Sequence, residues 1–335
     1  MRCLTLADEL LRRDARTHFI ARSPPGHLAE LIRQRGHDCT LLPAPTGSAR
    51  EEHEGSAHRL AAQDANETTK ALMALGDLDW LVVDHYALDA AWEESIRRLG
   101  PRILAIDDLA DRPHHCDILL DQNLQMRDDR YDRLLPETSL RLLGPTYALL
   151  RPQFAAARKT LAPRTGKVER ILISFGGSDP DNLTATTLDA VVETSGSDLA
   201  IDVVLGPGNP RRQELEARCA RTDNVTSHWN VTDMAALMAI ADLSVGAVGA
   251  TTWERACLGL PAIVVTIADN QRPTAACAER RGILQWLGDA EDITAAQIAT
   301  ALRTALAQPN ALAAQSHQGM VMVDGNGAVR VAEAM

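Results

Sequence analysis

The sequence predicts an α/β protein made of two doubly wound domains, and three observations support that class. Apolar runs of strand length alternate with longer helical patterns along the chain. Most of these runs are near-continuous Val, Ile and Leu, which is typical of parallel strands buried on both faces. The length of 335 residues corresponds to about two domains at roughly 100–200 residues each.

The elements alternate in the order that right-handed crossovers require. An amphipathic helix is expected first, over Met1–Asp14, with Leu4, Ala7, Leu10 and Leu11 on one face. The expected strands are Thr17–Ala21, Asp38–Leu42, Trp80–Asp84, Arg102–Asp107, Asp117–Leu120, Arg170–Phe175, Ala200–Leu205, Leu243–Gly246 and Ala262–Ile267. The helices expected between them include His27–Arg35, Ala90–Leu99, Leu183–Glu193, Ala235–Ala241 and Thr252–Leu258.

The opening helix is unusual for this class. A doubly wound domain normally begins with a strand that lies in the middle of its sheet. The sequence therefore predicts that the first domain lacks its central strand, either because the true start lies upstream or because the domain is damaged. We favour an upstream start, because losing such a strand would cost around 10 kcal/mol, close to a whole domain's stability of ~5–15 kcal/mol.

The domain boundary is expected around Ala155–Lys167, where residues 162–167 are polar and turn-rich and a strand restarts at Arg170. The predicted domains are therefore residues 1–160 and 168–335, both Rossmann-like, with a cleft between them.

Composition excludes several partners and locations. Lys and Arg total 34 against 45 Asp and Glu, a net charge of −11, which disfavours nucleic-acid binding. No apolar run approaches the ~20 residues of a membrane span, and the first residues lack a signal-peptide core. These features predict a cytoplasmic protein.

Two strand-to-helix turns are candidate ligand sites. In Ile171–Leu183, a Gly176-Gly177 turn lets the backbone approach a ligand, and the helix amino terminus favours anions; the alternative is a plain turn capped by Asp or Asn. In Ala241–Ile267, the small residues Gly246, Ala247, Gly249 and Ala250 leave room for a diphosphate. Glu254, expected in the first turn of the following helix, suits the helix dipole but is also able to accept two ribose hydroxyls.

Other polar groups follow predicted strands, where open α/β sheets bind ligands. They are Asp84-His85-Tyr86, Asp107-Asp108, His114-His115-Cys116-Asp117 and Asp269-Asn270-Gln271. A metal site in the His-Cys-Asp segment is disfavoured, because consecutive strand positions point in different directions. Asp84 is alternatively a turn cap and His85 a solvated side chain.

Together these segments resemble one family, the UDP-2,4-diacetamido-2,4,6-trideoxy-β-L-altropyranose hydrolases of pseudaminic acid biosynthesis. The resemblance covers nearly the whole chain. The segments that carry it are MRCLTLA, DHYxLDxxWE, IDDLADRxHxCDILLDQN, GPxYALLRPxF, ILISFGGSDPxNLT, GAxGATTWE and ADNQ. That family is similar to the two-domain GT-B glycosyltransferases, and the resemblance implies hydrolysis of a UDP-sugar to UDP and free sugar without a metal or cofactor.

The resemblance also implies roles for individual residues. Glu254 would hold the uridine ribose. Tyr86 and Asn270 would lie near the sugar and the attacking water, and Arg151 near the interdomain cleft. The remaining substrate-binding candidates are Phe175, Gly176, Gly177, Ser178, Gly249, Thr251 and Gln271. The family's catalytic base is a His in a Gly-x-Gly-His segment that would precede Met1; Gly26-His27 resembles that pair but lies one strand–helix unit later, so we do not assign His27 as the base.

Two alternatives stay open at this point. The same cleft could present an acceptor hydroxyl instead of water, which would make the protein a GT-B glycosyltransferase. A chain without the base could also hold UDP and catalyse nothing. The oligomeric state and the stereochemistry of the sugar are not determined by the sequence.

Overall fold

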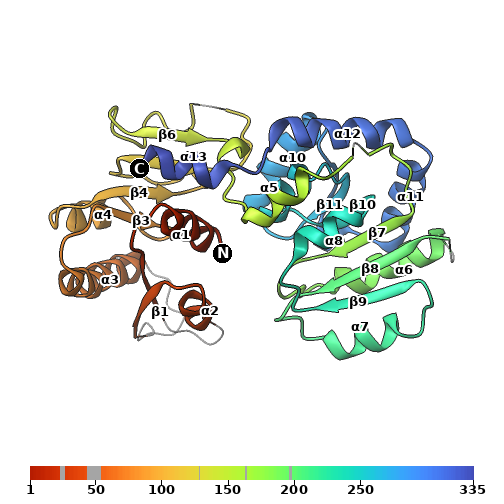
Figure 1. Ribbon diagram of the computed structural model, residues 1–335, viewed down its shortest axis with the longest axis horizontal. Coiled ribbons are helices and arrows are strands. Elements are labelled where there is room, and N and C mark those ends of the chain that lie inside the picture. The colour runs from red at the N-terminus through yellow and green to blue at the C-terminus, as the bar shows by residue number, and fades with distance from the viewer. Residues whose placement is uncertain (23–26, 44–53, 128, 163, 196–197) are drawn as a thin grey trace. The chain divides into compact units, whose positions relative to one another are not determined.

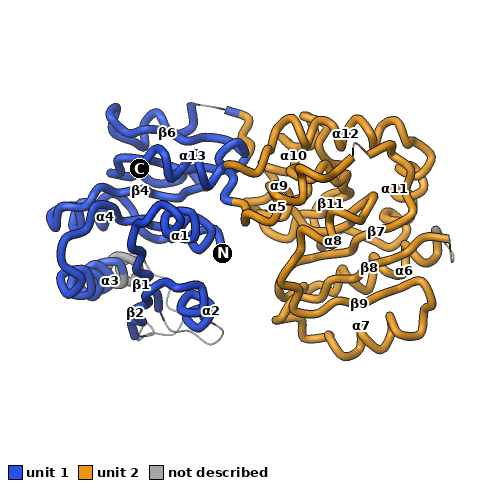
Figure 2. Tube along the Cα trace, viewed as in Figure 1, with its two compact units in different colours: residues 1–123, 127–149, 327–335 blue, residues 124–126, 150–326 orange. Residues whose placement is uncertain are grey.

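The computed structural model describes residues 1–22, 27–43, 54–127, 129–162, 164–195 and 198–335. They divide into two compact α/β units (Figures 1 and 2). Unit 1 comprises residues 1–123, 127–149 and 327–335, and unit 2 comprises residues 124–126 and 150–326. Among the described residues, no helix has the length and apolar character needed to cross a bilayer.

Unit 2 is built on a six-stranded parallel sheet in the order β12-β11-β10-β7-β8-β9. Its strands are β7 (Arg170–Ser174), β8 (Ala200–Leu205), β9 (Val225–Trp229), β10 (Leu243–Ala247), β11 (Ala262–Thr266) and β12 (Gln285–Asp289). The chain runs outward from β7 to β9 and then returns to the other side of β7 to form β10 through β12. The topological switch point therefore lies between β7 and β10, where a doubly wound sheet binds its ligand.

The core of unit 2 surrounds these central strands. Every residue of β10 and of β11 is buried, as the near-continuous apolar sequence predicts for strands covered on both faces. The helices of this unit are α5 (Pro152–Arg158), α6 (Leu183–Ser195), α7 (Arg212–Cys219), α8 (Met234–Ile240), α9 (Ala250–Cys257), α10 (Arg272–Arg280), α11 (Ala295–Leu306) and α12 (Pro309–Met322), with short 3₁₀ turns η2 (Asp269–Gln271) and η3 (Ala290–Asp292).

The described strands of unit 1 form two separate parallel sheets. One contains β1 (His18–Arg22) and β2 (Asp38–Leu42); the other contains β3 (Trp80–Val83), β4 (Arg102–Ile106), β5 (Ile118–Asp121) and β6 (Leu140–Leu143) in that order. The helices are α1 (Arg2–Arg12), α2 (Ala29–Gln34), α3 (Glu54–Leu75), α4 (Ala90–Arg97), α13 (Gly327–Ala334) and the 3₁₀ turn η1 (Pro145–Tyr147).

Helix α1 connects the two sheets of unit 1. Its first residue, Arg2, forms an ion pair with Asp84 directly after β3, and Asp8 contacts His37 directly before β2. In the described part of the unit, β1 pairs only with β2, and β3 only with β4.

The division into units differs from the expected boundary at residues 160–168. Helix α5 belongs to unit 2, because Arg158 donates to the carbonyl oxygens of Cys257 and Met320 at 2.7 and 2.8 Å. The last helix returns to unit 1, where Val331 of α13 packs with Leu6 of α1 in one buried apolar cluster. A boundary placed at a polar segment of the sequence does not predict the positions of α5 and α13. Each helix belongs to the unit against which it packs, and local sequence does not reveal that contact.

All nine expected strands are confirmed, with ends that agree to within one residue. Three observed strands were not expected, namely β6, β9 and β12. Each of the three lies at the edge of its sheet. Their sequences are more mixed, as in SHW and GD, because an edge strand is less completely buried.

Candidate functional site

The switch point of unit 2 brings the two candidate turns together. Strand β7 leads into Gly176 and Gly177, and the neighbouring β10 leads into Gly249 and α9. Gly246 pairs with Ser174 in this register. A Cβ on Gly246 would lie 2.1 Å from the carbonyl oxygen of Ser174, so only glycine allows the two strands to end this close together.

The turn after β7 is exposed at its glycines but is anchored on both sides. Gly176 has a φ of +84°, and Gly177 and Ser178 are exposed. Phe175, predicted as part of the loop that faces the nucleotide and sugar, has its ring buried in the core of unit 2. Any ligand contact at this position would come from its backbone.

The amino terminus of α6 is already occupied by a carboxylate of the protein. Asp179 is buried, and its two oxygens accept hydrogen bonds from the backbone N–H groups of Leu183 and Thr184 at 2.9 and 3.1 Å. The capping alternative considered from the sequence is therefore the one observed. An anionic ligand would have to displace Asp179 to use these donors.

Helix α9 has a different amino terminus. Its N-cap is Gly249, which has no side chain to satisfy the first N–H groups, and the Gly249 N–H itself donates to Thr252 Oγ1 at 3.3 Å. The Thr251 hydroxyl lies 3.5 Å from the carbonyl oxygen of Ala247. Of the two helices at the switch point, α9 is the one whose terminus is open to an external anion.

The helix begins at Ala250, two residues earlier than expected. The prediction that Glu254 lies in the first helical turn is therefore wrong, because Glu254 is the fifth residue of α9. A carboxylate at this depth gains little from the helix dipole, whose effect is confined to the terminal turn. The dipole explanation for Glu254 is weakened accordingly.

Glu254 is paired with Arg151 inside unit 2. Arg151 Nη2 lies 3.4 Å from Glu254 Oε1, and Nη1 donates to the carbonyl oxygen of Thr232 at 3.0 Å. The side chains are 16% and 15% exposed, so the pair is shielded but reachable from solvent. Burial raises the pKa of the Glu254 carboxyl, and the Arg151 charge offsets part of that rise.

The segment after β11 contributes Asn270 and Gln271 on the 3₁₀ turn η2. Asn270 is exposed. The Gln271 side chain accepts a hydrogen bond from the Ile267 N–H at 2.9 Å, so its carbonyl oxygen is engaged in closing the turn. Because β11 neighbours β10, this turn follows the strand next to the switch point.

Unit 1 presents a second polar cluster at the carboxyl end of β3. Arg2 binds Asp84 with two hydrogen bonds of 2.7 and 3.0 Å and reaches Asp108 at 3.4 Å. Asp84 is therefore an ion-pair partner and not a turn cap. Tyr86 is 50% exposed beside it, and burial together with the Asp108 carboxylate raises the pKa of its phenol.

The two histidines considered from the sequence have local structural roles. His27 Nδ1 accepts the Ala29 N–H at 3.3 Å at the start of α2, and His85 Nδ1 accepts the Ala87 N–H at 3.1 Å. Gly26 lies outside the described residues. Nothing in these contacts makes His27 a base.

Beneath the unit 1 cluster lies a buried polar chain that sequence analysis did not foresee. Glu93 binds His114 at 2.7 Å, and the Tyr131 hydroxyl binds Asp107 at 3.0 Å and Asp121 at 3.3 Å. Burial opposes the charge on His114, but the Asp107 and Glu93 carboxylates outweigh it and raise its pKa to about 9. Burial raises the pKa of Asp121 to about 7.

This chain explains the His-His-Cys-Asp segment in terms of protein contacts. His114 is held by Glu93, His115 pairs with Glu94 at 2.6 Å, and Asp117 pairs with Arg97 at 2.9 Å. No group of three or more metal-ligating side chains is found within the described residues.

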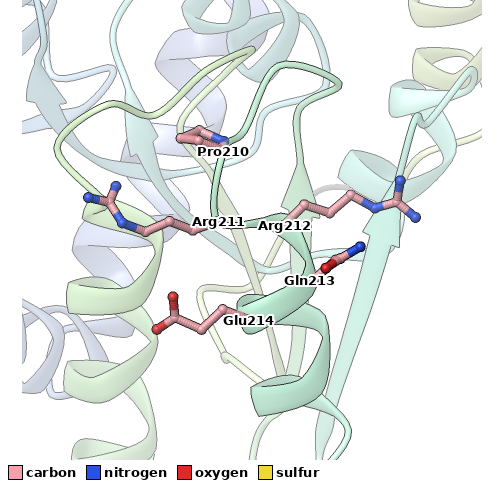
Figure 3. A pocket seen from close by; sticks show the side chains of 5 residues that line it. All are labelled: Pro210, Arg211, Arg212, Gln213 and Glu214. Carbon is pink, nitrogen blue, oxygen red and sulfur yellow. The ribbon is translucent and has the colours of Figure 1, made fainter.

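A shallow hollow lies at the start of α7. Its lining residues are Pro210, Arg211, Arg212, Gln213 and Glu214 (Figure 3). The two arginines point in opposite directions in this view. Arg211 donates to the carbonyl oxygen of Pro180, and Arg212 lies over the ring of Trp229, so both serve local contacts.

Comparisons with known proteins define the class. Residues 171–330 match the glycosyltransferase family 28 C-terminal domain. MurG of Acinetobacter baumannii superposes with a TM-score of 0.69 at 16% identity, covering 99% of this chain and 94% of that one. A UDP-GlcNAc 2-epimerase from Neisseria meningitidis, bound to UDP-GlcNAc, superposes with a TM-score of 0.62 at 13% identity over 99% and 95% of the chains. The protein therefore has the two-domain, Rossmann-like GT-B fold.

The relatives found by sequence comparison match only part of this chain. An uncharacterized protein, MJ1062, of Methanocaldococcus jannaschii is 30% identical over 58% of this chain and 41% of its own length. The spore coat polysaccharide biosynthesis protein SpsG of Bacillus subtilis is 28% identical over 56% of each chain. The matched region thus spans about two fifths and just over half of these two relatives. A UDP-2,4-diacetamido-2,4,6-trideoxy-β-L-altropyranose hydrolase of Campylobacter jejuni is 26% identical over 60% of this chain and 71% of its own length.

Proposed function

We propose that this protein binds a UDP-sugar at the switch point of unit 2 and hydrolyses it to UDP and free sugar. The observation that carries the proposal is the Arg151–Glu254 pair beside the glycine-capped amino terminus of α9. A shielded carboxylate suits two ribose hydroxyls, and an uncapped helix terminus suits the diphosphate that follows the ribose. The match to a glycosyltransferase family 28 C-terminal domain over residues 171–330, which include Glu254 and α9 but not Arg151, supports this assignment.

In this account the nucleotide is held by unit 2. Glu254 accepts the ribose hydroxyls, and the first N–H groups of α9 together with Gly249 and Thr251 face the diphosphate. Gly176, Gly177 and Ser178 supply backbone donors from the neighbouring turn. Arg151 holds the Glu254 carboxylate in place, and its charge offsets part of the rise in the pKa of that carboxyl that burial causes.

The reaction that we propose is attack by water on the anomeric carbon. A new carbon–oxygen bond forms from water, the bond from that carbon to the bridging phosphate oxygen breaks, and UDP leaves with the bridging oxygen. The proton lost by water goes to a general base. By the resemblance, this base is a His that would precede Met1, with Tyr86 and Asn270 in supporting positions.

The sugar that we propose is a 2,4-diacetamido-2,4,6-trideoxy hexose, a precursor of pseudaminic acid for surface glycans. The Campylobacter jejuni relative is a hydrolase of such a compound, and the Bacillus subtilis relative serves polysaccharide biosynthesis.

A GT-B glycosyltransferase is the second candidate. The fold occurs in transferases and in an epimerase alike, so the fold alone does not select the reaction. The family 28 match favours a transferase as much as a hydrolase. The third candidate is a chain that binds UDP and catalyses nothing.

Product analysis separates the three. The full chain is incubated with the UDP-linked diacetamido-trideoxy sugar, with and without a lipid or sugar acceptor, and the products are followed by NMR. Equal release of UDP and free sugar without acceptor supports hydrolysis. A sugar–acceptor conjugate would show a transferase, and UDP binding with no product would show the inactive binding protein.

A further inference from the structure

Arg255 is a buried residue in the last turn of α9, but its guanidinium lies toward the amino terminus of that helix. It follows Glu254 in α9, and it is only 2% exposed. Its guanidinium Nη2 donates to the carbonyl oxygen of Ala247 at 2.9 Å and lies 3.5 Å from Thr252 Oγ1. The side chain therefore runs back toward the amino terminus of its own helix, as helical side chains do.

This position is electrostatically unfavourable on its own. Helix amino termini carry partial positive charge, and cations are normally placed at the carboxyl end. No ion pair with a carboxylate is described for Arg255, and its neighbour Glu254 is paired with Arg151. Burial lowers the pKa of Arg255 to about 10, so it is still charged at neutral pH.

A second arginine, the half-buried Arg164, shows what a purely structural role looks like. Arg164 donates at 2.9 Å to the carbonyl oxygens of Met238 and Ala241. These carbonyls lie at the carboxyl end of α8, where a cation is favourable. Burial lowers the pKa of Arg164 to about 10 as well. Both guanidiniums thus donate to carbonyl oxygens, but one lies at the carboxyl end of a helix and the other toward an amino terminus.

Arg255 also lies directly under the loop that leads to α9. A Cβ on Gly246 would be 3.3 Å from Arg255 Nη1, so the guanidinium packs against the end of β10. The positive charge of Arg255 and the partial positive charge of the α9 amino terminus both lie near Gly249. Both would be stabilised by an anion placed over Gly249.

We propose that Arg255 is a positioning residue for the diphosphate: it supplies a buried positive field beneath the α9 loop and fixes that loop through the Ala247 carbonyl, without touching the ligand. The inference rests on the proposed nucleotide site and deepens it. It assigns the phosphate affinity to Arg255 and the α9 terminus, and the ribose affinity to Glu254.

The test is calorimetric titration of the full chain with UDP, uridine and inorganic pyrophosphate. Arg255→Met removes the charge but keeps an unbranched side chain, and such replacements of buried charges are often tolerated. The loss of one buried positive charge that does not touch the diphosphate corresponds to roughly tenfold in affinity if it removes about 1.4 kcal/mol of attraction. We expect Arg255→Met to weaken UDP and pyrophosphate about tenfold, to leave uridine within about twofold, and Arg255→Lys to restore most of the loss.

Arg164→Met is the matched control. We expect it to lower the melting temperature while leaving the ratio of UDP to uridine affinity unchanged. Equal loss of UDP and uridine affinity in Arg255→Met, or no loss of either UDP or pyrophosphate, would overturn the role of Arg255. If wild type binds pyrophosphate in an Arg255-dependent way but binds neither uridine nor UDP, the proposed function fails and the phosphate role stands.

Discussion

The guanidinium of Arg151 lies 3.4 Å from the carboxylate of Glu254, although 103 positions separate the two residues in the sequence. Arg151 is the N-cap residue of α5, and Glu254 lies in the second turn of α9. The other terminal nitrogen of Arg151 donates to the Thr232 carbonyl oxygen. The guanidinium that pairs with Glu254 is therefore held in a fixed orientation. The pair gives unit 2 a pre-oriented acceptor at the switch point of its sheet.

The first prediction concerns Glu254. Glu254→Ala should weaken UDP binding about 10- to 100-fold, because charge-assisted hydrogen bonds to ribose hydroxyls contribute ~1.5–3 kcal/mol. Isothermal titration with UDP measures the effect, and a melting curve confirms the fold. Glu214→Ala is the control, since Glu214 is exposed and lines the hollow of Figure 3. If Glu214→Ala lost more UDP affinity than Glu254→Ala, the nucleotide site would have to be assigned to that hollow instead.

The second prediction concerns the close approach of β7 and β10. Gly246→Ala places a methyl group 2.1 Å from the Ser174 carbonyl oxygen, so the strand ends must separate. Overpacking of this kind costs about 1–3 kcal/mol of unfolding free energy or more. Gly177→Ala is the matched control, because nothing lies within 4 Å of its added Cβ. Urea unfolding should show the loss in Gly246→Ala alone; equal stability of both variants would contradict the observed packing.

The third prediction concerns the pH dependence of unit 1. The folded-state pKa of Asp121 is raised to about 7 from 3.8, so its contribution is fully present below the unfolded value and is lost as pH rises through about 7. Asp121→Asn removes this proton but keeps an oxygen that accepts the Asn123 N–H. Relative to wild type, the variant should gain about 2 kcal/mol of unfolding free energy between pH 5 and pH 8.

Urea unfolding of both proteins at pH 5 and pH 8 provides the measurement. Asp129→Asn serves as the control, since Asp129 is exposed and forms an ion pair with the nearby Arg127. A difference between wild type and Asp121→Asn that is the same at both pH values would show that Asp121 does not titrate in this range.

The fourth prediction concerns the two sheets of unit 1. A strand placed ahead of Met1 would end beside Asp84 and run parallel to β3, because Arg2 fixes the start of α1 at that point. A chain extended upstream by about 15–20 residues should therefore unfold more cooperatively and at higher urea than the chain that starts at Met1. An extension of equal length with proline at alternate positions, which is unable to form the ladder, is the control. Equal stability of all three chains would contradict the expectation of an absent central strand.

The sequence was sufficient to predict the central strands, but not the edge strands or the final helix. Strands such as β10 and β11 are apolar throughout, so their position follows from burial on both faces. The edge strands β9 and β12 carry no such pattern. The return of α13 to unit 1 depends on a surface formed by α1 and the sheet, which no local pattern records.

The candidate site shows the same division. The glycines and Glu254 were predicted from a strand, a small-residue loop and a helix in sequence. The helix start at Ala250, the capping by Asp179, the burial of Phe175 and the position of Arg255 were not, because each is decided by contacts across the sheet. Arg2 was missed for the same reason, since its partners lie 82 and 106 positions away.

The central claim is hydrolysis at the anomeric carbon of a UDP-sugar, and oxygen-18 water tests it most directly. The UDP-linked diacetamido-trideoxy sugar is incubated in labelled water with whichever chain of the extension experiment turns over, and both products are analysed by mass spectrometry. We expect one labelled oxygen in the free sugar and none in UDP. Label in UDP would show that water attacks phosphorus and would contradict hydrolysis at the anomeric carbon.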